Sequence, residues 1–257
     1  MFAKERQNAI SELLLKNNAV TTAHLMKLFD VSIETVRKDL LCMEKEGLLS
    51  RVHGGAVAKG DMKPFFDLKQ RNTERGEQKT ELSIKATDFI SDGDVIAVDA
   101  GSTATFFSEI LKERFSKLTI VTHSLDIFQR LSNHKEFEVI LCGGHYLKNE
   151  SAFYGALTMD ILSVLHVQKV FLFPSAVSLS NGICDFHTEL YQIQRQLIQL
   201  ADEVFILADS GKFEKKALLK IADTEKRYTY ITDSKLPAEL LKLYRENDIV
   251  IHAGGEI

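Results

Sequence analysis

Apolar residues in the first fifty positions recur every three or four residues in three stretches, which is the spacing of amphipathic helices. Ser32 is a good N-cap for the third of these helices. The residues that follow, LLSRVHGGAVA, predict a hairpin that turns at Gly54-Gly55. The expected elements are helices over 4–16, over a short segment capped by Thr21 or Thr22, and over 33–46, followed by a strand over 49–53 and a short return strand. Three short helices and a hairpin in this order predict a winged helix-turn-helix.

From residue 77 onward, helix-like segments alternate with short apolar runs. The runs are DVIAVDA, LTIVTHS, FEVILCGG, KVFLFPSAV, EVFILADS, RYTYITD and DIVIHA, and the clearest helices between them span 103–112, 125–132 and 189–201. Continuous apolar runs are typical of strands that are covered on both faces. The pattern predicts an α/β fold, in which a small N-terminal winged helix-turn-helix domain precedes a doubly wound, mostly parallel sheet.

These patterns divide the chain into three parts. We expect a winged helix-turn-helix domain over 1–57, a polar linker over 58–76, and an α/β domain over 77–257. The composition, 45% hydrophobic and 26% charged, is ordinary, and no apolar run reaches the roughly 20 residues of a membrane helix. The charged start, MFAKERQNAI, lacks the apolar core of a signal peptide. We therefore expect a cytoplasmic protein that does not contact membranes.

The three cysteines are too far apart for a zinc site or a disulfide framework. They are Cys42, Cys142 and Cys184, in no CxxC spacing. The histidines are likewise scattered, and none has a metal-ligand spacing such as H-E-x-x-H. We expect neither a metal nor a cofactor.

The third helix and the hairpin carry the candidates for DNA contact. Residues 1–60 hold nine Lys and Arg against seven Asp and Glu, so net charge alone is inconclusive. The pattern is more informative, because short polar residues begin the outward face of the third helix and basic residues follow. The candidates are Ser32, Glu34, Thr35, Arg37 and Lys38 on the helix, and Arg51 and His53 on the hairpin. The alternative is a small helical bundle with a solvated charged face.

Small and polar residues follow several of the expected strands. They are Asp99, Gly101, Ser102 and Thr103; Thr122, His123 and Ser124; Gly143 and Gly144; and Asp209 and Lys212. In a parallel α/β sheet, such positions converge at the carboxyl ends of the strands, where ligands bind. Gly101 permits close approach of a ligand, and the hydroxyls of Ser102 and Thr103 begin a helix whose N-terminus favours an anion. The alternative is that GSTA only caps a helix and that Lys212 is a solvated lysine.

The chain resembles the DeoR family of bacterial transcriptional regulators. The segments VSIETVRKDL and EKEGLLSRVHGGA resemble the DNA-binding signature of that family. Farther on, GDVIAVDAGSTAT, LTIVTHSL, VILCGG and ILADSGKF resemble its sensor domain, which is similar in fold to ribose-5-phosphate isomerase. The resemblance implies binding of double-stranded operator DNA and of a phosphorylated sugar or related metabolite. It also implies a homo-oligomer, dimer or tetramer, that regulates carbohydrate genes, most often as a repressor.

Three departures from the family pattern lie at the expected ligand rim. This chain has FPSAV where glycine-containing residues are usual, Thr-His where Thr-Asn is usual, and ADSGK where ADxSK is usual. The alternative function is a sugar-phosphate isomerase with an appended DNA-binding domain. Aldose–ketose isomerisation needs an acid–base group beside the substrate carbonyl. The segment 171–182 contains no Asp or Glu, although Asp185 and Glu189 follow it. We therefore expect a binding site and not an enzyme.

Overall fold

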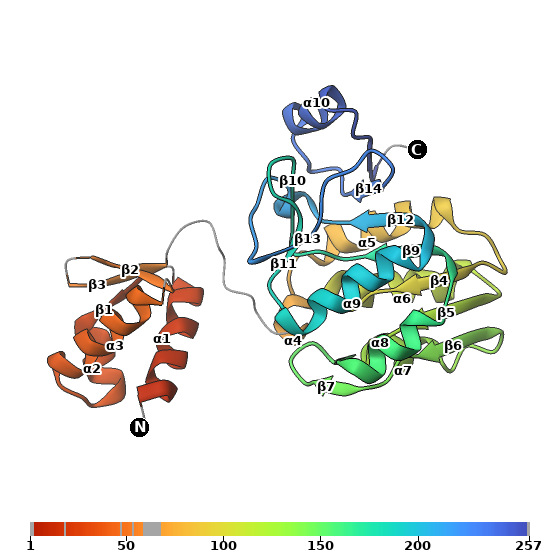
Figure 1. Ribbon diagram of the computed structural model, residues 1–257. Coiled ribbons are helices and arrows are strands. Elements are labelled where there is room, and N and C mark those ends of the chain that lie inside the picture. The colour runs from red at the N-terminus through yellow and green to blue at the C-terminus, as the bar shows by residue number, and fades with distance from the viewer. Residues whose placement is uncertain (1–2, 18, 47, 53, 59–67, 256–257) are drawn as a thin grey trace. The chain divides into compact units, whose positions relative to one another are not determined.

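The computed structural model describes residues 3–17, 19–46, 48–52, 54–58 and 68–255. By their internal contacts these residues belong to two compact units, Met1–Phe65 and Phe66–Ile257 (Figure 1). Each unit has its own apolar core.

The first unit is a winged helix-turn-helix. Its helices are α1 (Ala3–Asn17), α2 (Thr22–Phe29) and α3 (Ile33–Lys45), and its strands are β1 (Ala19–Thr21), β2 (Leu49–Val52) and β3 (Gly55–Ala58). The strands form an antiparallel sheet in the order β1-β3-β2. The three predicted helices and the hairpin are confirmed. His53, predicted to end the first strand of the hairpin, lies outside the described residues.

Caps and close packing explain this local structure. Thr21 Oγ1 accepts a hydrogen bond from His24 N–H and caps α2, while Ser32 Oγ accepts from Thr35 N–H and caps α3. Strand β1 was not predicted, because three residues are too few to show a period. It lies so close to β3 that a Cβ on Gly55 would be 2.0 Å from the Val20 carbonyl oxygen. The buried core of this unit comprises Ile10, Leu14, Val20, Leu25, Val36, Leu40, Met43, Leu49 and Ala56.

The second unit is built on a seven-stranded parallel sheet. Its strands are β4 (Val95–Val98), β5 (Leu118–Thr122), β6 (Phe137–Leu141), β9 (Val167–Leu172), β12 (Ala201–Leu207), β14 (Thr229–Thr232) and β15 (Ile251–Ala253). Their order across the sheet is β15-β14-β12-β9-β4-β5-β6, and every neighbouring pair is parallel. All seven apolar runs of the sequence form these strands, which confirms the predicted α/β fold.

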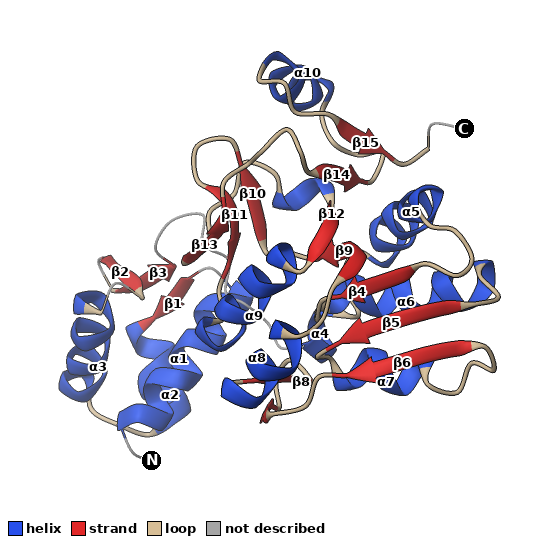
Figure 2. Ribbon diagram, turned by 45° about the vertical axis from the view of Figure 1, so that its right-hand side comes forward, coloured by secondary structure: helices blue, strands red, loops and turns tan. Residues whose placement is uncertain are grey.

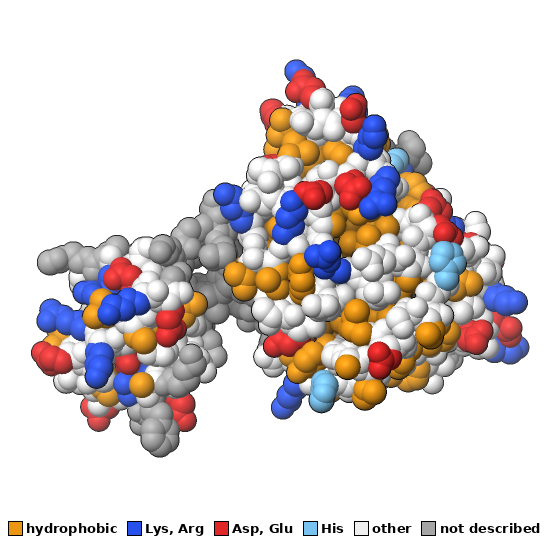
Figure 3. Space-filling view, in the orientation of Figure 1, with side chains coloured by type: hydrophobic (Ala, Val, Ile, Leu, Met, Phe, Trp, Pro, Cys, Tyr) orange, Lys and Arg blue, Asp and Glu red, His pale blue; other side chains and the backbone are white. Residues whose placement is uncertain are grey.

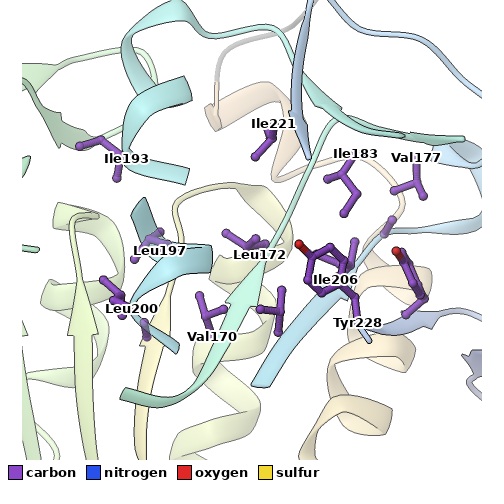
Figure 4. Close-up of a cluster of buried hydrophobic side chains, with 14 of the residues drawn as sticks. Val170, Leu172, Val177, Ile183, Ile193, Leu197, Leu200, Ile206, Ile221 and Tyr228 are labelled. Carbon is purple, nitrogen blue, oxygen red and sulfur yellow. The ribbon is translucent and has the colours of Figure 1, made fainter. Parts of the chain in front are cut away.

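Helices cover both faces of this sheet (Figure 2). They are α4 (Leu68–Arg71), α5 (Gly76–Ala86), α6 (Ser102–Arg114), α7 (Leu125–Leu131), α8 (Ala156–Ser163), α9 (Thr188–Gln199) and α10 (Ala238–Glu246), with 3₁₀ turns at Thr87–Phe89 and Ser210–Lys212. One core packs α8, α9 and α10 on the sheet and includes Leu162, Ile193 and Tyr244. Figure 4 shows part of this core, with Ile193 and Leu197 of α9 near Val170 and Leu172 of β9. The other packs α5, α6 and α7, and contains Leu82 and Phe107. The sheet is therefore doubly wound, as predicted.

The structure corrects the sequence-based expectations in detail. The helix expected over 189–201 ends at Gln199, and Ala201 already belongs to β12. Two small antiparallel sheets were not predicted: β7 (His145–Leu147) with β8 (Ala152–Tyr154), and β10 (Ala176–Ser178) with β11 (Gly182–Asp185) and β13 (Leu219–Ala222). Their strands are short and broken by turns. Within the segment 58–76, residues 68–71 form α4, whose Leu68 is buried.

In the part of the chain that the structure describes, no helix is both long and apolar enough to cross a bilayer.

Candidate functional site

The N-terminal half of α3 forms an exposed polar surface. Glu34, Arg37 and Lys38 are exposed on it. The hydroxyls of Ser32 and Thr35 lie 3.1 Å apart at the start of the helix, beside these three side chains. The five candidates on the helix are thus brought together, and Figure 3 shows Lys and Arg side chains gathered on this unit. Short side chains at the helix start leave room for base edges, and the two cations can reach phosphates or bases.

A buried ion pair anchors α3 to α1. Arg6 Nε donates to Asp39 Oδ2 at 2.7 Å, and Arg6 Nη2 donates to Oδ1 at 3.2 Å. Both side chains are at most 10% exposed, so this two-pronged contact lies inside the unit. Asp39 points away from the surface that Arg37 and Lys38 occupy. The ion pair therefore fixes the rotation of α3 about its own axis.

The hairpin carries one described candidate, Arg51. Its backbone N–H donates to Glu44 Oε1 at 2.8 Å, and its guanidinium Nη1 lies 4.0 Å from Glu44 Oε2. The Arg51 side chain remains 40% exposed. A single exposed carboxylate at this distance holds an arginine weakly, so Arg51 stays available to a phosphate. The other candidate, His53, lies outside the described residues.

The expected ligand rim occupies one edge of the parallel sheet. The candidate groups follow β4, β5, β6 and β12, and β9 lies between β12 and β4. The end of β9 links the two sides of the rim. A Cβ on Gly101 would lie 3.7 Å from Phe173 Cβ, and Lys212 Nζ donates to the Pro174 carbonyl at 2.7 Å. The structure therefore brings the GSTA segment and Lys212 to the two sides of residues 173–174.

The start of α6 has the features of an anion-binding terminus. Gly101, with φ of +140°, precedes the helix, and no side chain caps its first N–H groups. Ser102 and Thr103 are buried in the first turn. Thr103 Oγ1 has no hydrogen-bond partner among the described residues. An uncapped helix start beside an unsatisfied buried hydroxyl fits an anionic oxygen.

Asp99 and His123 lie in the interior and contact each other. Both are fully buried, and His123 Nε2 is 2.9 Å from Asp99 Oδ1. The other ring nitrogen, Nδ1, is 3.0 Å from the Phe153 carbonyl oxygen. Both ring nitrogens thus have an oxygen as partner, and which nitrogen donates depends on the tautomer. Both residues lie beneath the surface of the rim, and neither is exposed to solvent.

A glutamine extends this buried pair to a second carboxylate. Gln194 Nε2, on α9, donates to Asp99 Oδ2 at 3.2 Å and to Asp185 Oδ2 at 2.8 Å. Asp185 Oδ1 accepts from Ser175 Oγ at 2.8 Å. Both carboxylate oxygens of Asp185, the first acidic residue after the segment 171–182, therefore already accept hydrogen bonds from the protein.

The other candidates at the ends of β5 and β6 have structural partners. Thr122 Oγ1 donates to the Val98 carbonyl at 2.8 Å, and Ser124 Oγ accepts from Ile127 N–H and caps α7. A Cβ on Gly144 would lie 2.2 Å from Thr158 Oγ1, so this glycine permits close packing on α8. Gly143 has open space around it, and its carbonyl accepts from Thr158 Oγ1.

A cluster of cations beside Asp209 was missed by the sequence analysis. It comes from residues 71–79, most of which were assigned to the linker, and it comprises Arg71, Arg75 and Lys79 together with the predicted Lys212. Lys79 Nζ is buried and donates to the carbonyls of Arg71 and Glu74. Desolvation lowers the pKa of Lys79 to about 8, and the positive charge of Lys212 adds to this effect. Desolvation also lowers the pKa of Lys212, against the attraction of Asp209.

A second carboxylate receives Arg71. Arg71 Nη2 forms an ion pair with Glu150 Oε2 on the turn between β7 and β8, and His187 Nε2 lies 3.0 Å from Glu150 Oε1. Glu150 is buried, and the backbone N–H of Leu68 donates to the carbonyl of the preceding Asn149. These contacts hold α4 against the turn between β7 and β8. A pattern of apolar residues gives no signal for such contacts.

Among the described residues, no group of three or more His, Cys, Asp or Glu side chains is arranged to hold a metal ion.

A winged helix-turn-helix combined with a separate α/β domain that carries a cationic rim defines a DNA-binding protein with a sensor domain. Residues 6–60 match the model of the DeoR-like helix-turn-helix domain, and residues 74–234 match that of the DeoR C terminal sensor domain. The chain belongs to the DeoR family of DNA-binding transcriptional regulators.

Relatives match the chain over nearly its whole length. The uncharacterized HTH-type transcriptional regulator YulB of Bacillus subtilis is 30% identical over 98% of this chain and 97% of its own. The HTH-type transcriptional regulator GolR of Listeria innocua is 30% identical over 96% of each chain. The lactose phosphotransferase system repressor of Lactococcus lactis is 29% identical over 98% of this chain and all of its own.

Among solved structures, ribose 5 phosphate isomerase A from Neisseria gonorrhoeae matches 56% of each chain, with a TM-score of 0.43 and 16% sequence identity.

Proposed function

We propose that this protein is a repressor of carbohydrate-metabolism genes in the cytoplasm, whose affinity for its operator changes when a phosphorylated sugar or related metabolite binds the second unit. The observation that carries the proposal is the uncapped start of α6 with the unsatisfied Thr103 hydroxyl, on the same rim as Lys212. Relatives named for sugar systems support the class of effector, among them the L-fucose operon activator of Haemophilus influenzae and the lactose phosphotransferase system repressor.

The first unit binds the operator through the exposed half of α3. Ser32, Glu34 and Thr35 meet base edges, and the cations Arg37 and Lys38 contact bases or phosphates. Arg51 contacts the backbone from the hairpin, with His53 beside it in the sequence. Because paired half-sites require a symmetric protein, the regulator acts as a homo-oligomer.

The second unit binds the phosphate at the start of α6. The N–H groups of the first turn and the hydroxyls of Ser102 and Thr103 donate to its oxygens, and Lys212 adds a positive charge from the opposite side of residues 173–174. Thr122, Ser124, Gly143 and Gly144 shape the neighbouring edge of the rim, while Asp99, His123 and Asp209 support it.

The same geometry favours binding over turnover. An isomerase needs a carboxylate or comparable base within reach of a carbon-bound proton of its substrate. Asp99 and Asp185 are buried and already have protein partners: Gln194 donates to both carboxylates, Ser175 donates to Asp185, and His123 lies 2.9 Å from Asp99. We therefore propose that the site senses its ligand without transforming it.

The test is a binding titration on a DNA duplex selected by the protein itself from a random library. Arg37→Ala and Lys38→Ala should each weaken DNA binding. Each should also make the slope of log K against the logarithm of the salt concentration shallower by about one. Lys45→Ala, which removes an exposed cation from the far end of α3, is the matched control. Wild-type salt dependence in both test variants would contradict the assignment of α3 as the recognition helix.

The effector is tested in the same titration. Ribose 5-phosphate, fructose 6-phosphate, glucose 6-phosphate and galactose 6-phosphate are added in turn, with each parent sugar and inorganic phosphate as controls. We expect one phosphorylated sugar to change operator affinity roughly 5- to 150-fold. The isomerase alternative predicts conversion of the added sugar phosphate, which the same samples reveal by chromatography.

A further inference from the structure

Arg75 adopts a backbone conformation that an arginine rarely has. Its φ is +52°, in the left-handed region, at the residue before α5. This conformation is unfavourable for residues with a side chain, and the Arg75 side chain makes no capping hydrogen bond to the helix. Its guanidinium reaches instead to the end of β12, where Nη1 donates to Asp209 Oδ1 at 2.7 Å.

Gly211 makes room for that guanidinium. A Cβ on Gly211 would lie 1.8 Å from Arg75 Nη1 and 2.4 Å from both Cζ and Nη2. Gly211 has no positive φ, so its backbone conformation does not itself require glycine. The missing side chain at 211 and the left-handed backbone at 75 thus have one common consequence: the Arg75 guanidinium packs against the 3₁₀ turn that carries Lys212.

The residues that follow Arg75 pack against the first turns of α6. A Cβ on Gly76 would lie 3.6 Å from the ring of Phe106, and Lys79 Nζ lies 5.6 Å from the centroid of that ring. Phe106 is three residues after Thr103 on α6, so the two occupy the same face of the helix. The segment with Arg75 therefore bridges the two sides of the rim, from Asp209 to the first turns of α6.

The charge of Arg75 differs in kind from the charges of its neighbours. Burial lowers the pKa values of Lys79 and Lys212, whereas the Arg75 side chain is 41% exposed and an arginine stays protonated at any pH that the fold tolerates. A guanidinium also presents a planar fork that matches two oxygens of a phosphate or carboxylate.

We propose that Arg75 is an effector-binding residue, whose guanidinium, admitted by the missing side chain at Gly211, binds the anionic group of the effector at the mouth of the rim. This inference rests on the proposed function, because it concerns the same ligand. Asp209 keeps Nη1 oriented while the exposed edge of the fork meets the ligand.

The experiment measures affinity for the sugar phosphate of the panel that stabilises the full-length protein most in a thermal-shift screen. Isothermal titration is then carried out on the wild type, Arg75→Gln, Gly211→Ala and the double variant. Loss of a charge-assisted hydrogen bond should weaken binding about 10- to 100-fold in each single variant. Arg195→Gln, which removes an exposed arginine from α9, is the matched control and should bind like the wild type.

The double variant shows whether Gly211→Ala weakens binding by displacing the Arg75 side chain or by disturbing the site in another way. The three atoms nearest to an added methyl at 211 all belong to the flexible end of Arg75, so Gly211→Ala should have no further effect once Arg75 is glutamine.

Two results overturn the inference in different ways. If Arg75→Gln binds the sugar phosphate as tightly as the wild type, or if Gly211→Ala weakens binding equally with and without Arg75, the role of Arg75 is wrong and the effector class stands. If the wild type binds no member of the panel, the proposed effector class fails, and the Arg75 proposal fails with it.

Discussion

At the residue scale, the burial of Lys79 makes the free energy of unfolding depend on pH. Its ammonium donates to the carbonyls of Arg71 and Glu74, and desolvation lowers its pKa from 10.5 to about 8. The positive charges of Lys212 and Arg71 act in the same direction, while Asp209 and Glu74 oppose it. The neutral amine retains two hydrogens, enough for both carbonyls, so deprotonation preserves the hydrogen bonds.

The sign of the resulting effect on stability follows from proton uptake. Between about pH 8 and pH 10.5 the unfolded chain holds a proton on Lys79 that the folded chain has released. The free energy of unfolding therefore rises with pH across this window. We expect the wild type to gain stability relative to Lys79→Met between pH 8 and pH 10.5 in urea denaturation. Lys242→Met removes an exposed ammonium and should show no such trend; a flat difference for Lys79→Met as well would contradict the prediction.

At the element scale, α3 depends on its anchor to α1. Asp39→Ala leaves the Arg6 guanidinium buried without its carboxylate, and breaking a buried pair in this way costs about 3–5 kcal/mol. We expect faster hydrogen exchange in α1 and α3 and a loss of operator affinity that exceeds the loss in Arg37→Ala. Glu34→Ala, on the exposed face of the same helix, should change stability by about 1 kcal/mol or less. Equal exchange rates in Asp39→Ala and the wild type would refute the role of the pair.

The elements also show which features a sequence can reveal. Each of the seven strands of the parallel sheet can be recognised in the sequence as a continuous apolar run, because helices cover both faces of the sheet. Ser32 was recognisable as a cap, and Thr21 as one of two candidates with Thr22, because a capping side chain bonds to a backbone N–H only a few residues away. Strands β1 and β7 have three residues each and pair with distant partners, so no local period identifies them.

The same reasoning explains what was predicted of the candidate site. The rim itself follows from the parallel sheet, because all its strands end at one edge. The cations Arg71, Arg75 and Lys79 come near that rim only once the chain has folded. Arg71 pairs with Glu150, 79 residues away, and Arg75 pairs with Asp209, 134 residues away. Likewise, burial of His123 against Asp99 depends on the packing of β8, which the pattern of the chain does not show.

At the scale of the whole molecule, regulation requires that effector and operator be coupled thermodynamically. If bound sugar phosphate lowers the affinity for operator by some factor, bound operator must lower the affinity for sugar phosphate by the same factor. We expect both factors to lie between roughly 5 and 150 and to agree within error. Two titrations measure them: operator binding with and without saturating sugar phosphate, and sugar-phosphate binding with and without a saturating operator duplex. A scrambled duplex of equal length and composition is the control.

This comparison distinguishes a regulator from a protein that merely contains two binding sites. Consider a sugar phosphate that has the same affinity for the free protein and for the protein bound to operator. By linkage it cannot release the protein from DNA, however tightly it binds. If the affinity for operator fell while the affinity for sugar phosphate did not respond to operator, the change in DNA binding would come from the solution, for example from added ionic strength, and not from the sensor domain. Equal factors in both directions would place the coupling in the protein itself.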